Sequence, residues 1–511
     1  MAEGLYQSPV VACPSLAELT RLSEEMRLQC TDEDLQAVRE EFQEVAAALQ
    51  RLSQLKQPSL PVKYPRTPGW KPDQNNPYNA WYWRCDIKGA DTGKLAGKTF
   101  AIKDNIAVAG VPMMNGSKIL EGYTPEFDAT AVTRILDAGA TIAGKANCEH
   151  LCGSASSFTC DAGPVRNPLD ETRSTGGSSS GCGALVASGE VDMALGGDQG
   201  GSIRMPSSWC GIVGLKPTFG LVPYTGAMPM ETTLDHLGPM TKTVADCALL
   251  LEVIAGYDDG RDPRQRPNTV VPEYSKLIDA GISGKKIGVL KEGFDVCAEP
   301  DVVEIVRREV DRLKEAGAEV EEVSLPIHLD GTIIRTPAMM YGEYKFMIQG
   351  NGTGMFWKGF YPLSLREATC RGLQTRPQDL SGDVKMMCLT AEYLDRHYQN
   401  KFYAMGQNMT MVLTKAYDQV LEQYDVLVMP TMSCKASKLP LAKARLSDIL
   451  KAAQRVEKNV APFNSTGHPA LSINAGFSEG LPVGMQIVGR HFDETTVLQV
   501  ARSYEKIRDM K

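Results

Sequence analysis

Two glycine turns that carry serines, together with a lysine before them, have the residue types of a nucleophilic site. The first turn reads GGSSSG at residues 176–181 and the second reads DQGGSIR at 198–204, so that Ser178 and Ser202 lie 24 residues apart. Glycines in front of a serine let the backbone approach a substrate closely and direct N–H groups at one point. A serine hydroxyl needs a base to become a nucleophile, and Lys103, within the segment AIKDN, is a candidate.

The first turn also fits a different motif, the G-x-S-x-G turn that presents the nucleophile in α/β-hydrolases. That interpretation makes Ser179 the nucleophile and requires an acidic residue and then a histidine later in the chain. Such a turn follows a buried strand, whereas residues 168–175 are polar and begin with a proline. The sequence therefore favours a site that uses both turns.

A third glycine segment comes close to a phosphate-binding loop. Residues 139–146 read GATIAGKA, which has the spacing G-x-x-x-x-G-K but ends in Ala146 where a Mg²⁺-binding serine or threonine is required. We interpret these glycines as a turn between a helix and a strand and expect no nucleotide to bind there.

Composition limits the kind of partner. The 511 residues carry a formal net charge of −8, which argues against a nucleic acid or an anionic membrane as the main partner. The first residues lack the pattern of a secretory signal, and no run approaches the ~18 consecutive apolar residues of a membrane span. We expect a cytoplasmic protein that acts on a small molecule.

The cysteines favour reduced thiols over disulfides or metal sites. There are 13 of them, an odd number, and no C-x-x-C motif occurs. Cys148, His150 and Cys152 lie close together in the sequence, but zinc sites favour other spacings and a second pair of ligands. We expect neither a metal nor another cofactor.

The apolar periodicity from about residue 95 predicts an α/β domain. Strands are expected at 98–102, 140–143, 286–290, 318–323, 425–429 and 482–488, and helices at 129–138, 181–189, 243–255, 301–316 and 493–507. Residues 330–422 have a mostly helical pattern rich in methionine, and they either line an apolar substrate pocket or form helical core. We expect residues 81–511 to be the catalytic domain, with 330–422 as a helical insert.

The beginning of the chain predicts a separate helical region at 1–57, followed by a proline-rich linker at 58–80. The pairs Ser15 with Glu18 and Thr31 with Asp34 have the spacing of capping boxes. The second helix has a regular apolar face, made by Leu35, Val38, Phe42, Val45, Leu49 and Leu52. Such a face packs on the main domain or on a second copy of the chain, and a homodimer is our hypothesis, which a monomer in sedimentation velocity would contradict.

The stretch from 176 to 223 resembles the hallmark of the amidase signature family. After the first serine turn it has GDQGGSIR at 197–204, then Gly211, Gly214 and the segment KPT at 216–218. Lys103 matches as well, 75 residues before Ser178. The similarity covers roughly residues 80–505, and the N-terminal helices with the segment VPMMNG at 111–116 most resemble bacterial enantioselective amidases of nitrile-degrading pathways. Ser180 departs from the common form GGSSGG, in which a third glycine stands there.

The resemblance implies a central mixed β-sheet flanked by helices and assigns roles to the residues of both turns. Ser202 is the nucleophile, Ser178 the bridging serine on a cis peptide bond, and Lys103 the base. The N–H groups around the developing oxyanion belong to Gln199, Gly200, Gly201 and Ser202, and the supporting residues are Ser179, Asp198 and Arg204. We expect Arg204 to pair with Asp198 rather than to bind a substrate carboxylate. A lysine accepts a proton only in its neutral form, so this mechanism needs a dry site.

The resulting hypothesis is an amidohydrolase that converts carboxamides into carboxylic acid and ammonia through an acyl-enzyme. A urethanase that hydrolyses carbamate esters would use the same three residues. A second alternative is the glutamine-hydrolysing component of a tRNA amidotransferase, which requires a protein partner. A binding protein without activity is a further class, and the intact set of Lys103, Ser178 and Ser202 argues against it.

Overall fold

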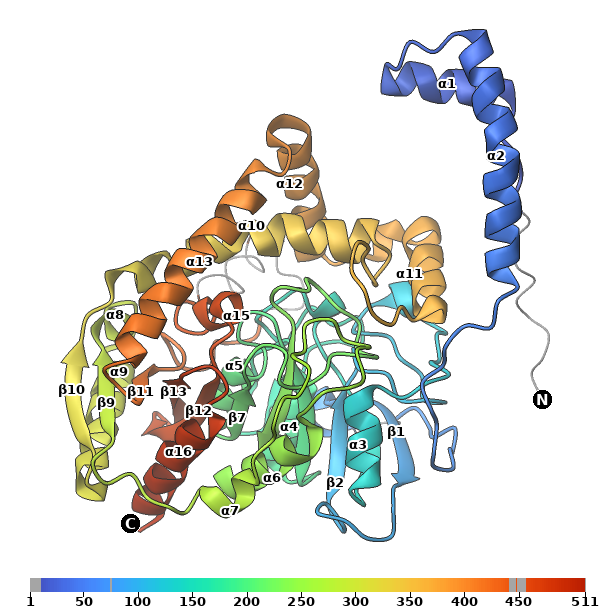
Figure 1. The fold of residues 1–511 in the computed structure, drawn as a ribbon. Coiled ribbons are helices and arrows are strands. Elements are labelled where there is room, and N and C mark those ends of the chain that lie inside the picture. Colours follow the sequence, from blue (N-terminus) through green and yellow to red (C-terminus); the bar gives the residue numbers. More distant parts are fainter. Residues whose placement is uncertain (1–10, 74–75, 441–446, 448–455, 511) are drawn as a thin grey trace. The chain divides into compact units, whose positions relative to one another are not determined.

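The computed structural model describes residues 11–73, 76–440, 447 and 456–510. Its contacts divide the chain into two compact units, Met1–Ser59 and Leu60–Lys511 (Figure 1). Among the described residues, none of the helices combines the length and the apolar character needed to cross a bilayer.

The first unit is a pair of capped helices, α1 (Leu16–Met26) and α2 (Asp32–Ser53). Both predicted capping boxes are present: the Ser15 and Thr31 side chains accept the N–H groups of Glu18 and Asp34, whose carboxylates accept in return. Within this unit Leu35 is buried, but the apolar residues that follow it on α2 stay 43–52% exposed, namely Val38, Val45, Leu49 and Leu52.

The second unit is built on a mixed sheet with the strand order β1-β3-β2-β6-β8-β7-β12-β13-β11-β9-β10. One end comprises β1 (Trp81–Lys88), β2 (Thr99–Lys103), β3 (Thr141–Ala146), β6 (Met193–Asp198), β7 (Val213–Lys216) and β8 (His236–Thr241). The other comprises β9 (Lys286–Leu290), β10 (Glu319–Val323), β11 (Val426–Pro430), β12 (Ala470–Ser478) and β13 (Leu481–Gly489). Strand β2 pairs in parallel with β3 and β6, whereas β8 and β12 pair with both of their neighbours in antiparallel fashion. A separate hairpin is formed by β4 (Arg166–Asn167) and β5 (Asp170–Ser174).

Helices pack on this sheet and extend beyond it (Figure 1). Those outside the region 330–422 are α3 (Thr130–Asp137), α4 (Ser180–Ser188), α5 (Arg204–Cys210), α6 (Val244–Ile254), α7 (Tyr274–Leu277), α8 (Lys291–Asp295), α9 (Pro300–Asp311), α15 (Pro462–Thr466) and α16 (Glu494–Asp509). The region 330–422 forms α10 (Gly331–Pro337), α11 (Leu363–Thr375), α12 (Gly382–Tyr398) and α13 (Lys401–Leu421). Two π-helical segments continue α10, Ala338–Gly342 and Tyr344–Gln349, with Glu343 between them.

The predicted α/β class is confirmed, and the predicted strands and helices lie within a few residues of those observed. Five strands of the main sheet were not predicted, namely β1, β6, β7, β8 and β12, and two of them show the reason. Strand β1 follows the proline-rich stretch and begins with three aromatic residues. From the sequence alone, such a segment is interpreted as a patch on the surface. Strand β8 contains His236, Gly238 and Pro239, which disfavour strands, yet all six of its residues are buried. Burial between neighbouring strands outweighed local propensity there.

Candidate active site

Lys103 is placed at the site by the register of parallel strands. Strands β2 and β6 pair in parallel, with Ile102 opposite Leu195, so their carboxyl ends, Lys103 and Asp198, lie at the same edge of the sheet. The Lys103 side chain is completely buried, and its Nζ lies 2.8 Å from Ser178 Oγ and 3.1 Å from the carbonyl oxygen of Gly197. The lysine and the first serine turn are therefore in direct contact.

Ser178 follows a position in the first turn, residue 177, that only glycine can occupy. The Gly177–Ser178 peptide is cis, as the family resemblance implies. A Cβ on Gly177 would overlap the backbone carbonyl of Ser156, so this position requires glycine. The Ser178 carbonyl accepts the N–H of Glu149 at 3.2 Å, and helix α4 begins two residues later.

The second turn lies against the first. The N–H of Ser179 donates to the carbonyl of Ser202 at 3.3 Å, while the Ser179 hydroxyl donates to the carbonyl of Gly197 at 3.0 Å. Ser202 itself is 5% exposed and lines the main pocket. The Ser179 hydroxyl is thus held by the scaffold, and this arrangement argues against the esterase-type interpretation.

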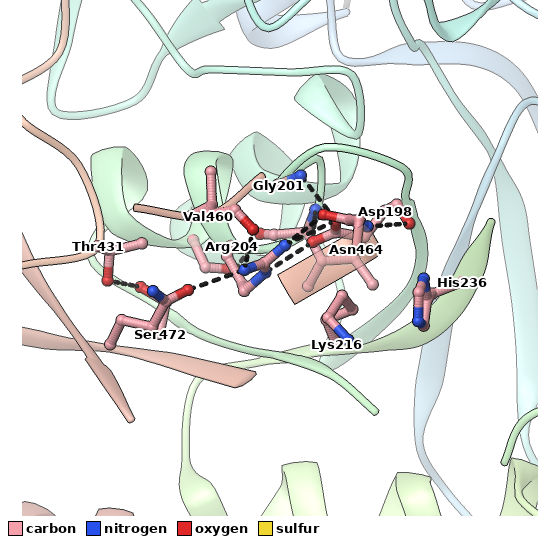
Figure 2. A network of polar contacts seen from close by, with 12 residues as sticks. Asp198, Gly201, Arg204, Lys216, His236, Thr431, Val460, Asn464 and Ser472 are labelled. Carbon is pink, nitrogen blue, oxygen red and sulfur yellow. Dashed lines mark hydrogen bonds and ion pairs between the residues drawn. The ribbon is translucent and has the colours of Figure 1, made fainter. Parts of the chain in front are cut away.

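A buried ion pair holds the turn of Ser202. Arg204 and Asp198 are both fully buried and form two contacts of 3.0 Å, as the sequence predicted (Figure 2). The guanidinium also donates, at 2.8 Å in each case, to Val460 O, Gln486 Oε1 and Asn464 Oδ1. Burial by itself would raise the pKa of Asp198, but the adjacent Arg204 charge lowers it below its ordinary value. The pair therefore stays ionised and ties α5 to α15 and β13.

The backbone N–H groups of this turn have different partners. That of Gly201 donates to Asp198 Oδ1 at 2.7 Å, and that of Ile203 to Asp198 Oδ2 at 3.1 Å. Those of Gln199, Gly200 and Ser202 have no hydrogen-bond partner among the residues that the structure describes. Of the four N–H groups predicted for an oxyanion, the one on Gly201 is therefore engaged by the scaffold, and the other three face no acceptor in the part of the chain that the structure describes.

The pocket in front of Ser202 has a volume of about 310 Å³, and six methionines contribute to its wall. Its methionines come from α5, from the segment before β8 and from the helical insert: Met205, Met230, Met339, Met340, Met386 and Met387. Thioether side chains adapt to apolar groups of different shape. Two alternatives were left open for region 330–422, and it fulfils both: four of these six methionines line the pocket, while Met347 and Met387 belong to a buried apolar cluster.

Polar side chains that sequence analysis missed interrupt this wall. Arg335 donates to the carbonyl of Gln199 at 3.3 Å and lies 3.3 Å from Glu457. Burial raises the pKa of Glu343 to about 8 and that of Asp383 above its ordinary value, and Asp383 Oδ2 has no partner among the described groups. These residues belong to no motif and lie far from the serine turns along the chain. The sequence therefore did not indicate that they reach the pocket.

Cys152 also reaches the pocket, beside the lysine and the bridging serine. Burial would raise the pKa of its thiol, but the hydrogen bond with Cys148 and the charge of Lys103 lower it to about 6. Both thiols donate to Asn115 Oδ1, at 3.4 and 3.2 Å, whereas Nε2 of His150 lies 3.0 Å from the Ser117 hydroxyl. The close contact of His150 is therefore with a hydroxyl group and not with either sulfur.

The loop that resembled a phosphate site has a structural role. Lys145 is fully buried in β3, and its Nζ lies 3.0 Å from the carboxylate of Asp104. That carboxylate in turn accepts the N–H groups of Met114 and Asn115. The ammonium of Lys145 is thus engaged inside the protein, as the interpretation of a helix–strand turn requires.

Comparisons with known proteins show which family the chain belongs to. The family model described as Amidase matches residues 79–498. The chain belongs to the amidase signature family. It is 47% identical over 450 residues to the enantioselective amidase of Rhodococcus rhodochrous, with 86% of each chain covered. As a member of this family it is a hydrolase that acts on C–N bonds of non-peptide amides.

More distant relatives in this family have names that give other activities. A glutamyl-tRNA(Gln) amidotransferase subunit from Methanosarcina mazei is 38% identical over 444 residues, covering 83% of this chain and 87% of that one. Among solved structures, the native peptide amidase of Stenotrophomonas maltophilia superposes with a TM-score of 0.68 at 28% identity, covering 81% of this amidase and 83% of that chain.

The Asp198→Asn variant of this amidase tests the structural role of the ion pair. Because the substitution leaves Arg204 buried without a counter-charge, we expect a loss of about 3–5 kcal/mol in the free energy of unfolding. Urea denaturation followed by circular dichroism measures this loss. The matched control is Asp279→Asn, at a half-exposed carboxylate that pairs with Arg502 and Lys506 and is expected to cost under about 1 kcal/mol. Equal losses in the two variants would contradict the assignment.

Proposed function

We propose that this amidase converts carboxamides into carboxylic acid and ammonia through an acyl-enzyme on Ser202. The observation that carries the proposal is the 2.8 Å contact between Lys103 Nζ and Ser178 Oγ in a buried site directly behind the turn of Ser202. A lysine without a carboxylate partner, surrounded by protein, can act as a base in its neutral form. The second turn then supplies both a nucleophile and unpaired N–H donors.

In the proposed reaction, Ser202 Oγ attacks the amide carbon and gives its proton to Ser178 Oγ, which passes its own proton to Lys103 Nζ. The oxyanion accepts hydrogen bonds from the N–H groups of Gln199, Gly200 and Ser202, and each such donor is typically worth about 10²–10³ in rate. The relay then runs in reverse and protonates the leaving nitrogen, so that the C–N bond breaks and ammonia departs. A water molecule hydrolyses the ester on Ser202 by the same relay.

We further propose that the acyl part of the substrate is apolar. This is supported by the methionine wall of the pocket and by its volume of about 310 Å³, which suits an aromatic or branched aliphatic group. The name of the Rhodococcus rhodochrous relative, an enantioselective amidase, agrees with a pocket that distinguishes the substituents of a chiral acid.

The two alternatives share the three reacting residues and differ in what the pocket must hold. Hydrolysis of a carbamate ester would place an alkoxy oxygen where the amide has carbon, and nothing in the pocket wall excludes it. Release of ammonia from glutamine is supported by the Methanosarcina mazei relative, and Arg335, Glu343, Asp383 and Glu457 in the pocket could pair with its charged groups. The six methionines of the wall favour an apolar acyl group instead.

The Ser202→Ala variant tests the assignment of the nucleophile. Removal of the attacking oxygen is expected to lower kcat by up to about 10⁶-fold, because residues of such a relay act as a unit. Ammonia release from an aryl-substituted primary amide measures the loss, with the melting temperature as a check on folding. The control is Ser188→Ala, at an exposed serine on the last turn of α4, which should keep full activity. A Ser202→Ala enzyme with near-normal kcat would refute the mechanism.

A substrate panel distinguishes the candidate activities. We expect kcat/KM for an aryl-substituted primary amide to exceed that for glutamine by at least about tenfold, since one apolar group in a fitted pocket is worth ~1–3 kcal/mol. Ammonia release from the amide, ethyl carbamate and glutamine is measured with the purified chain alone. A preference for ethyl carbamate would establish the urethanase, and hydrolysis of glutamine only in the presence of a partner would establish the amidotransferase component.

A further inference from the structure

Away from the serine turns, three side chains with metal-ligating atoms converge near the end of α13. They are Asp418 on α13, His468 just after α15 and His491 just after β13, and one ligand atom of each lies within 4.8 Å of the other two. Asp418 Oδ1 lies 3.1 Å from His468 Nε2 and 3.5 Å from His491 Nδ1. No step of the proposed amide hydrolysis uses these residues.

The position of the proton on His491 leaves the lone pair of its other ring nitrogen directed at the Asp418 carboxylate. Nε2 of this ring lies 2.8 Å from the backbone carbonyl of Thr466, and because a carbonyl only accepts, Nε2 must carry the hydrogen. In the neutral ring Nδ1 is then an acceptor, and it faces Asp418 Oδ1, another acceptor. Two acceptors at this distance repel each other unless a positive charge lies beside both.

His468 is fully buried, and its backbone carbonyl accepts from Lys216 Nζ at 2.7 Å, so the backbone that carries this ring is held inside the fold. A metal ion bound directly by the two nitrogens and the carboxylate would supply the charge without protonating a ring.

The other ring nitrogens are held in the way that metal-binding histidines require. Thr466 contacts both rings: its hydroxyl lies 2.9 Å from His468 Nδ1, and its carbonyl accepts from His491 Nε2. The carbonyl fixes the tautomer and orientation of His491, and the hydroxyl, which can donate or accept, holds the orientation of His468; outer hydrogen bonds hold ligating imidazoles in this way. They leave His468 Nε2 and His491 Nδ1 on the side of Asp418, whose side chain is 49% exposed and open to solvent.

We propose that Asp418, His468 and His491 bind a divalent transition-metal ion of the zinc class. Two imidazoles and one carboxylate are a ligand set that suits Zn²⁺, and solvent water can complete the coordination on the exposed side. The ion would join α13, the end of α15 and the end of β13. Since α15 also carries Asn464, which contacts Asp198 and Arg204, the site acts as a clip on the scaffold of the second serine turn.

Metal titration of the full chain, after treatment with EDTA and dialysis, tests this proposal. With Zn²⁺ we expect a rise in melting temperature that saturates at one equivalent. With Co²⁺ we expect visible absorption bands typical of nitrogen and oxygen ligands. Asp418→Asn, a conservative change at a half-exposed side chain, and His491→Ala should each weaken binding at least tenfold. The control is His397→Ala, on α12, where the ring stacks on Tyr393.

Three results would overturn the proposal. The first is the absence of both the thermal shift and the Co²⁺ bands in the unaltered chain. The second is equal weakening in His397→Ala, which would indicate loose binding to surface histidines. The third is intense near-ultraviolet charge transfer from thiolate to Co²⁺ in place of the expected bands, which would place the ion on cysteines such as the exposed Cys13. Circular dichroism of Asp418→Asn separates lost binding from lost folding.

Discussion

The buried ion pair between Asp198 and Arg204 is the interaction on which the rest of the site depends. Asp198 ends β6 and accepts the N–H groups of Gly201 and Ile203, so it fixes the path of the chain on both sides of Ser202. Arg204 begins α5 and extends the same network to Val460, Asn464 and Gln486. Neither charge reaches solvent, and each is acceptable inside the protein only because the other is present.

This constraint divides the backbone of the turn between structure and chemistry. The N–H of Gly201 is used to close the turn, which leaves those of Gln199, Gly200 and Ser202 for a ligand. Glycine is required at 201, where φ is +121° and a Cβ would overlap Val460, whereas at 200 a Cβ would meet only the mobile end of the Arg335 side chain. The parallel pairing of β2 with β6 then brings Lys103 to the back of the two serine turns.

The sequence allowed much of this to be predicted where the residues are close along the chain or repeat with a period. Ser178, Ser202, Lys103 and the pairing of Asp198 with Arg204 follow from motifs whose members are separated by fixed spacings, and the strand–helix–strand unit at 286–323 follows from periodicity. Fold class and family were predicted correctly on this basis.

What could not be predicted depends on contacts between distant parts of the chain. Asn464 and Gln486 bond to Arg204 across 260 and 282 residues, and no local pattern marks them. Arg335 on α10 and Glu343 between the two π-helical segments line the pocket from the helical insert, far along the chain from the serine turns. The engagement of Gly201 was missed for the same reason: whether an N–H is free depends on where the Asp198 carboxylate lies, which the motif does not state.

Covalent labelling with a fluorophosphonate tests the central claim, that the second turn presents an activated serine behind which Lys103 and Ser178 form a proton relay. Such a reagent forms a phosphorus–oxygen bond with an activated serine and releases fluoride, and peptide mapping by mass spectrometry locates the adduct. We expect one adduct, on Ser202, that forms far more slowly in the Lys103→Ala variant. An adduct on Ser179 or on Cys152, or a rate that does not depend on Lys103, would contradict it.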